Sequence, residues 1–203
     1  ENFGIQFNRS DIEGSENIKA SIDNAIDFNR GTTIGIGNIL IHTVEHVMAA
    51  VYGLEITNLL IEVNNIETPV VDGSSKPFVD ILLECGIIEQ NEDRDEIEIK
   101  EVIRYSNNKD AVDIYVIPSD SFKVTFMADF SQQSIGTQYA SIYSLEKQFK
   151  SDISPARTFG LLSELKTLKE SGLIKGGSLE NAIIFSDDDF SNDIEKEIRV
   201  LFN

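Results

Sequence analysis

Hydrophobic and polar residues alternate with a period of two in several short stretches, and this pattern predicts β-strands. The stretches are residues 3–9, 58–65, 96–105, 110–118, 122–130 and 181–185. Three of them follow one another between residues 96 and 130, which suggests a meander. Residues 17–41 contain short apolar pairs separated by glycines, and we expect several short strands joined by glycine turns there.

Apolar residues spaced three and four apart predict helices elsewhere in the chain. Residues 42–52 carry such a stripe and are followed by Gly53, a common helix stop. A second helix should follow the Asp72-Gly73 turn, be capped by a serine and end at Gly86. Cys85 lies on its apolar stripe and is expected in the core. Further helices are expected at residues 145–150, 160–171 and 191–202.

A polar run at residues 89–96 has no periodicity and is the candidate linker. It divides the chain into a first domain, residues 1–90, and a second, residues 97–203. Each has strands and about two helices, so the expected fold class is α+β, with two similar domains built on small, mainly antiparallel sheets.

The chain has 203 residues and a formal net charge of −18, which disfavours nucleic acid as a partner. An acidic surface does not exclude a small anionic substrate, because a pocket can carry its own local field. No apolar run approaches the length of a membrane span. A single cysteine excludes a disulfide framework and fits a reducing, cytoplasmic location.

Both histidines of the chain lie in the segment IHTVEHVMAA, residues 41–50. His42, Glu45 and His46 match H-x-x-E-H, the inverted zinc-protease motif, and a spacing of four places both imidazoles on one helix face. Five letters are a weak signal. The alternative is an ordinary helix with one exposed histidine and one that is hydrogen bonded.

Longer motifs point to a more specific reading. The chain contains T-V-E-H in the expected helix, P-x-x-D-G-S before the next helix, and A-R-T-F-G followed by G-G-S. In this order and at these separations they resemble the zinc-dependent UDP-3-O-acyl-N-acetylglucosamine deacetylases of lipid A biosynthesis. The resemblance implies an α+β fold with the active site between two domains, a UDP-sugar substrate and a zinc cofactor.

The resemblance also implies roles for individual residues. His46 is the zinc ligand, Glu45 the general base, and Thr158 the hydroxyl that stabilises the oxyanion, whereas His42 is not a ligand. Asp72 either orients a ligand or simply makes the turn. Leu165 serves either the acyl-chain passage or ordinary helix core. The implied substrate-binding residues are Phe130, Phe159, Leu165, Ile174, Gly177 and Ser178.

The family completes its zinc site with an H-K-x-x-D segment and a further histidine, none of which occurs in these 203 residues. We therefore expect a chain truncated at both ends, with an incomplete zinc site and activity near background. The segment after residue 184 resembles the forms fused to a hydroxyacyl carrier-protein dehydratase.

Two rival hypotheses stay open at this point. An inverted-type metallopeptidase would hold zinc through both His42 and His46 with a downstream glutamate. A non-catalytic remnant would act as an interaction module, and unpaired strand edges would favour an edge-strand dimer.

Overall fold

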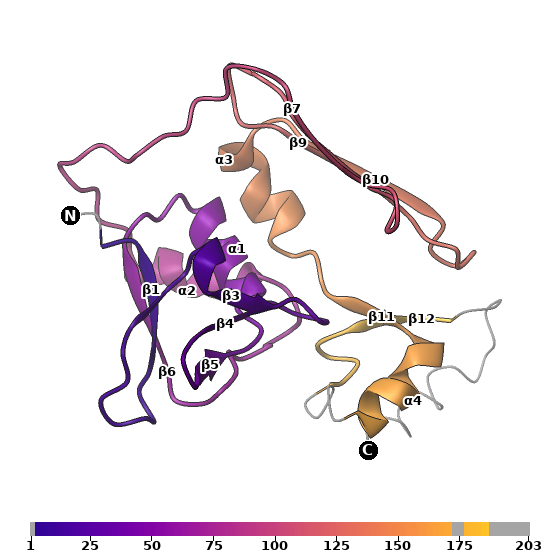
Figure 1. Cartoon of the computed structure of the whole chain (residues 1–203), viewed down its shortest axis with the longest axis horizontal. Coiled ribbons are helices and arrows are strands. Elements are labelled where there is room, and N and C mark those ends of the chain that lie inside the picture. Colours follow the sequence, from indigo (N-terminus) through magenta and orange to yellow (C-terminus); the bar gives the residue numbers. More distant parts are fainter. Residues whose placement is uncertain (1–2, 172–176, 187–203) are drawn as a thin grey trace.

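The structure is a computed structural model that describes residues 3–171 and 177–186. It is α+β, as expected, with small and mainly antiparallel sheets and few helices (Figure 1). The predicted helix at residues 191–202 and the acidic run that precedes it from Asp187 lie outside the described residues. No helix in the described part combines the length and apolar character needed to cross a bilayer.

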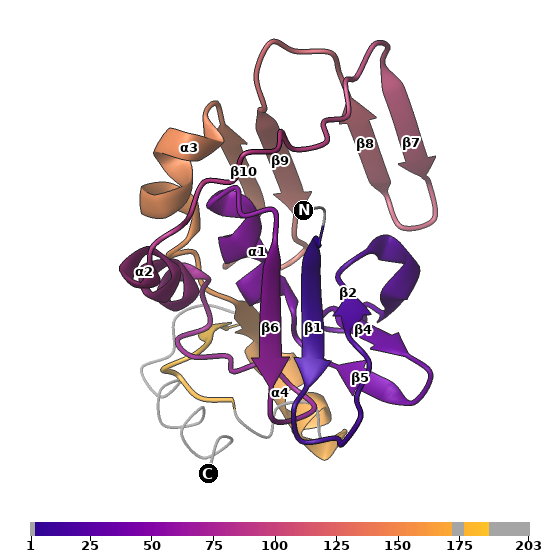
Figure 2. The same ribbon diagram turned by 90° about the vertical axis from the view of Figure 1, so that its left-hand side faces the viewer.

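The first sheet has the strand order β2-β1-β6. Strand β1 (Ile5–Arg9) pairs antiparallel with β2 (Ile18–Lys19) and parallel with β6 (Leu59–Val63), so that Ile5 lies opposite Leu59. Figure 2 shows β1 and β6 side by side. Phe7 and Ile18 lie opposite each other and are fully buried, which fixes the register of this pair.

The glycine-rich segment forms the predicted short strands. After a 3-10 turn, η1 (Ile22–Asn24), strand β3 (Ala25–Asp27) pairs with β4 (Thr33–Ile36), and β4 pairs with β5 (Ile39–Ile41), all antiparallel. This sheet ends at Ile41, immediately before the two histidines.

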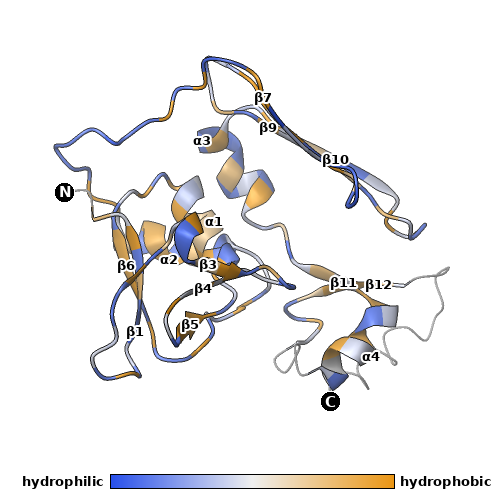
Figure 3. Cartoon of the chain, in the orientation of Figure 1, coloured by the Kyte–Doolittle hydropathy of each residue, from blue (hydrophilic) through white to orange (hydrophobic). Residues whose placement is uncertain are grey.

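Helix α1 (Glu45–Gly53) contacts two groups of apolar side chains. One face packs with Phe7, Ile34 and Val63 of the sheets through Val47 and Val51. A neighbouring side of the helix places Ala50 against Val79 and Phe149. The middle of α1 is therefore packed against both clusters. Hydrophobic residues accordingly concentrate on β6 and α1 in Figure 3.

Helix α2 (Lys76–Cys85) begins with Pro77 in its first turn and ends at Gly86, whose φ is +84°. These bounds confirm the predicted start and stop. Cys85 is exposed, so its predicted core position is wrong. The buried stripe of α2 runs through Val79 instead. An irregular and mostly hydrophilic connection follows between α2 and β7 (Figure 3).

Strands β7 (Ile103–Asn107) and β8 (Val112–Val116) form one antiparallel hairpin, and β9 (Val124–Asp129) and β10 (Thr137–Ile142) form another. The two hairpins make one layer, seen edge-on in Figure 1 and face-on in Figure 2. In the described part of the chain, β8 and β9 are not paired, so the predicted continuous meander is wrong. The predicted strand at residues 96–105 begins only at Ile103.

The chain then returns toward α1 through α3 (Leu145–Gln148) and a π-helical turn, η2 (Phe149–Ile153). Phe149 is buried, and its ring occupies the space that a side chain at Gly53 would fill. Strand β11 (Phe159–Leu161) follows, pairs in parallel with β12 (Ile183–Phe185), and leads into α4 (Leu162–Glu170).

Candidate active site

The helix that carries the T-V-E-H motif begins at Glu45, three residues later than predicted. His42 lies before it in an extended bridge with Glu67, and Thr43 has a φ of +59°. A left-handed residue between the two histidines interrupts any helix that would hold both. The predicted placement of His42 and His46 on one helix face is therefore wrong.

His42 is held by hydrogen bonds to its neighbours. Its Nδ1 lies 2.8 Å from the Thr33 hydroxyl, its backbone N–H donates to the Ile66 carbonyl, and its own carbonyl accepts from the Thr68 N–H. These contacts secure the end of β5 beside the segment that follows β6. A structural role for His42, the preferred expectation, agrees with this geometry.

Glu45 occupies the first turn of α1, and its carboxylate points toward the loop that precedes β4. Oε2 accepts a hydrogen bond of 2.8 Å from the Thr32 N–H. Oε1 lies beside Gly31, 3.2 Å from where a Cβ would stand. A negative charge is also favoured near a helix N-terminus. The carboxylate is thus fixed in direction by a backbone donor, which suits a group that must accept a proton at a set position.

His46 is the next residue along α1 and is half-buried. Among the described residues no three His, Cys, Asp or Glu side chains come together as a metal site. Catalytic zinc sites use about three protein ligands. His46 alone therefore does not make a zinc centre, and the described residues supply fewer than three ligands of such a centre.

Thr158, the predicted oxyanion residue, is fixed through its backbone on both sides. Its N–H donates to the Gly73 carbonyl at 2.8 Å, and its carbonyl accepts from the Ile183 N–H at 3.0 Å. In the described part of the chain its hydroxyl has no hydrogen-bond partner, and the residue is exposed. A rigid backbone with an open hydroxyl is what an oxyanion donor requires.

The motifs P-x-x-D-G-S and A-R-T-F-G join each other through Arg157. Its Nε donates to the Asp72 carbonyl at 2.7 Å, and its Nη2 donates to the carbonyls of Leu179 and Glu180. Gly73 has a φ of +80°, and a Cβ there would collide with the Asn181 carbonyl. We call this set, Asp72, Gly73, Arg157, Thr158 and residues 179–181, the joint.

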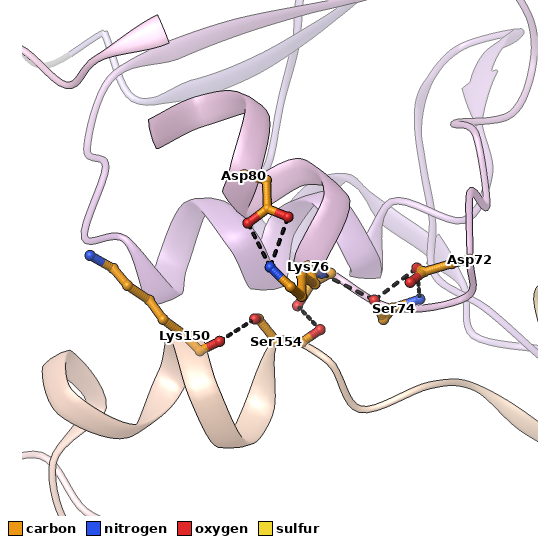
Figure 4. Close-up of polar contacts among 7 residues, drawn as sticks. Asp72, Ser74, Lys76, Asp80, Lys150 and Ser154 are labelled. Carbon is orange, nitrogen blue, oxygen red and sulfur yellow. Dashed lines mark hydrogen bonds and ion pairs between the residues drawn. The ribbon is translucent and has the colours of Figure 1, made fainter. Parts of the chain in front are cut away.

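Asp72 serves the joint as a turn residue. Its Oδ1 accepts from both the N–H and the hydroxyl of Ser74, at 3.0 and 2.8 Å, as Figure 4 shows. Burial works to raise the pKa of Asp72, but these hydrogen bonds and the charge of Arg157 outweigh it and hold the pKa below its ordinary value. Nearby, the Ser75 hydroxyl donates to the Ser154 carbonyl, a second buried link between the halves.

Phe130 and Phe159, both predicted to bind substrate, lie together. Their ring centroids are 5.6 Å apart in an edge-to-face arrangement, and Phe159 makes a similar contact of 5.7 Å with Phe185. Phe185 was missed by sequence reasoning, because its apolar strand pattern carries no sign of a role beyond packing. The three rings form an aromatic cluster beside Thr158.

The remaining predicted residues occupy different settings. Leu165 is buried in α4. Ser178 donates its N–H to the Asn181 side chain, and its hydroxyl accepts from the Glu180 N–H, so it stabilises the loop before β12. Gly177 is half-buried in the same loop. Ile174 lies outside the described residues.

A hollow of about 810 Å³ lies against β6 and α2 and includes Val47, Phe78 and Leu82 in its lining. Its lining contains none of the predicted site residues that the structure describes. The hollow is therefore separate from the predicted site residues, and both apolar and polar side chains line it.

Two connections link the Glu45 region to the Thr158 region. On one side, Thr68 is bonded to His42 and Thr43, and Gly73 is bonded to Thr158. The five residue-to-residue steps from Thr68 to Gly73 can span at most about 18 Å. On the other side, the Arg30 guanidinium forms a two-pronged ion pair with Glu164 of α4, at 3.0 and 2.7 Å. The α+β fold and this grouping define a candidate hydrolytic site.

Comparison with known proteins gives the family. The profile of the family described as LpxC, UDP-3-O-acyl N-acetylglycosamine deacetylase, matches residues 1–200, and the chain belongs to this family.

Similar proteins carry related names. The chain is 45% identical over 186 residues to the bifunctional enzyme LpxC/FabZ of Chlorobaculum tepidum, covering 92% of the chain and 40% of that protein. It is 41% identical over 191 residues to the UDP-3-O-acyl-N-acetylglucosamine deacetylase of Chlamydia pneumoniae, covering 92% of the chain and 66% of that protein. The chain thus spans less than two thirds of these relatives.

Proposed function

We propose that this chain carries the general base, the oxyanion donor and one metal ligand of a deacetylase. The enzyme would remove the acetyl group from UDP-3-O-acyl-N-acetylglucosamine in lipid A biosynthesis. Family membership and the name of the Chlamydia pneumoniae relative support the substrate class. The observation that carries the chemistry is the anchoring of the Glu45 carboxylate by the Thr32 N–H at the start of α1.

Glu45 would act as the general base. Amide hydrolysis needs a group that takes a proton from the attacking water and later returns one to the leaving amine. With Oε2 fixed by Thr32, the carboxylate has a defined direction. Oε1 faces Gly31, where the lack of a side chain leaves access to the carboxylate.

Thr158 would stabilise the developing oxyanion. The hydroxyl can donate to the negative oxygen that forms when water adds to the acetyl carbonyl. The joint holds the backbone of Thr158 in place before substrate arrives, through Gly73 and Ile183. A donor that is already positioned loses little free energy to reorganisation during the reaction.

Zinc dependence is part of the proposal, with His46 as one ligand. A bound zinc ion would supply Lewis-acid activation of water. The described residues do not complete such a site. We propose that the remaining ligands come from an H-K-x-x-D segment, which these 203 residues do not contain. The chain alone should then have activity near background.

The substrate would be held by the aromatic cluster of Phe130, Phe159 and Phe185, with Leu165, Ile174, Gly177 and Ser178 along the acyl chain. Edge-to-face rings offer an apolar surface for a sugar or the start of a lipid chain. A cytoplasmic location accompanies this proposal, since a nucleotide-linked sugar is a metabolite of that compartment.

An acetate-release assay on UDP-3-O-acyl-N-acetylglucosamine tests the proposal. In a form of the protein that supplies the missing zinc ligands, Glu45→Gln and Thr158→Val should each lower kcat about a hundredfold or more. Thr158→Ser keeps the hydroxyl and should retain most activity. Glu55→Gln, which changes an exposed carboxylate just beyond the C-terminal end of α1, is the matched control. Normal turnover of Glu45→Gln would refute the proposal.

A further inference from the structure

Arg30 has a backbone conformation that arginine rarely adopts. Its φ is +62°, in the left-handed region. The next residue is Gly31, which could adopt a left-handed conformation without strain, but the turn places Arg30 in it instead. Strain of this kind persists where surrounding contacts impose it, and it is often found at functional sites. The contacts of the Arg30 side chain are candidates for what imposes this conformation.

The guanidinium of Arg30 reaches α4 and forms a two-pronged ion pair with Glu164, between residues 134 positions apart in the sequence. The two side chains are 50% and 34% exposed. Ion pairs this exposed contribute little to stability. The paired geometry of guanidinium and carboxylate does fix orientation. The pair is thus better suited to setting a position than to stabilising the fold.

The position that it sets is that of the loop around Glu45. Directly after Arg30, Gly31 lies against Glu45 Oε1, and the Thr32 N–H donates to Oε2. The Thr32 carbonyl in turn accepts from the Val44 N–H at 3.2 Å. Residues 30–32 therefore lie against the start of α1. Arg30, at one end of this loop, pairs with Glu164, which is three residues after the end of β11, the strand that follows Thr158.

We propose that Arg30 and Glu164 form a latch that positions Glu45. By holding residue 30 against α4, the latch keeps the Thr32 N–H on the Glu45 carboxylate and sets the approach of Glu45 to the Thr158 side of the site. Arg30 and Glu164 are positioning residues that act through Thr32. The catalytic consequence rests on the proposed deacetylase function, whereas the structural consequence does not.

Hydrogen exchange of the Thr32 amide, followed by NMR on the 203-residue chain, tests the structural consequence. Arg30→Ala and Glu164→Ala should each speed exchange at Thr32 about two- to fivefold. The charge-swapped double variant Arg30→Glu with Glu164→Arg should restore much of the protection. Arg30→Gly removes both the backbone strain and the ion pair, whereas Arg30→Ala removes only the ion pair. Thr32 should exchange equally fast in the two variants if the ion pair, and not the strain, protects it.

The matched control is Arg94→Ala. Arg94 pairs with Glu55 at 2.8 Å and is also 50% exposed, but Glu55 follows the C-terminal end of α1, whereas Thr32 contacts its first residue. Its loss should leave Thr32 exchange unchanged. The latch is refuted if Thr32 exchange is the same in wild type, Arg30→Ala and Glu164→Ala, or if the swapped pair exchanges no more slowly than the single variants.

Steady-state kinetics then test whether the latch affects catalysis, in the form of the protein that supplies the remaining zinc ligands. The single latch variants should lower kcat about ten- to a hundredfold with KM nearly unchanged, because a misdirected base impairs the chemical step and not binding. Altered Thr32 exchange without any deacetylase activity in wild type would leave the latch standing and overturn the proposed function. Altered exchange with unchanged kcat would overturn the positioning role.

Discussion

The backbone N–H of Thr158 donates a hydrogen bond of 2.8 Å to the carbonyl of Gly73, two residues that are 85 positions apart. This single bond joins the loop before α2 to the strand that precedes α4. Around it, Arg157 and Asp72 add further bonds to the same joint. The residues that resemble a family signature are therefore largely the parts that fix one half of the site against the other.

Replacing Gly73 by alanine should disrupt the joint. A Cβ at Gly73 would overlap the Asn181 carbonyl, and the residue has a φ of +80°. We expect the free energy of unfolding to fall by about 3 kcal/mol or more. Urea unfolding followed by circular dichroism measures it.

Gly14→Ala is the matched control for that variant. Gly14 has a φ of +74°, but nothing lies within 4 Å of its added Cβ. It should cost about 1 kcal/mol, the strain of the backbone alone. Equal losses for the two variants would show that the contact with Asn181 contributes nothing.

Arg157→Lys should destabilise the protein although the charge is kept. A lysine cannot reproduce the guanidinium contacts to the carbonyls of Asp72, Leu179 and Glu180 at once. The expected loss is about 1.5–3 kcal/mol in the free energy of unfolding. Arg104→Lys, in an exposed pair with Asp113, should change it by less than about 0.5 kcal/mol. A loss at position 157 no larger than that at 104 would contradict the joint.

The pH dependence of stability should report on Asp72. Its pKa in the folded protein lies below the ordinary value of 3.8, so its ionised form stabilises the fold above pH 3.8. That contribution is lost as the pH falls through the folded pKa. The unfolding free energies of wild type and Asp72→Asn should differ by about 1 kcal/mol near neutrality and converge below pH 3.8. A difference that stays constant down to acid pH would contradict this assignment.

Much of the fold could be predicted from local patterns. Alternation located β1, β6, β8 and β9, and the Gly86 stop and the Asp72-Gly73 turn are features that backbone chemistry dictates. Strand β10 was not predicted, because its sequence TQYASI lacks clear alternation of apolar residues. The core position predicted for Cys85 is wrong, because residue spacing identifies the apolar stripe of a helix but not which of its residues other elements cover.

The candidate site was predictable in its residues and not in its geometry. Glu45, His46 and Thr158 came from motif resemblance, and their catalytic roles stay predictions. The late start of α1 at Glu45 depends on Thr43 adopting a left-handed conformation, which no residue type signals there. The Arg30–Glu164 pair joins distant segments, and only the fold reveals such a contact.

Zinc titration with elemental analysis on the 203-residue chain tests the central claim, that this chain holds one zinc ligand, His46, and none at His42. We predict weak binding in wild type, unchanged binding in His42→Ala and loss of binding in His46→Ala. Circular dichroism of each variant checks that the fold is retained. Tight binding abolished by either substitution would contradict the account, because it would require both imidazoles on one metal.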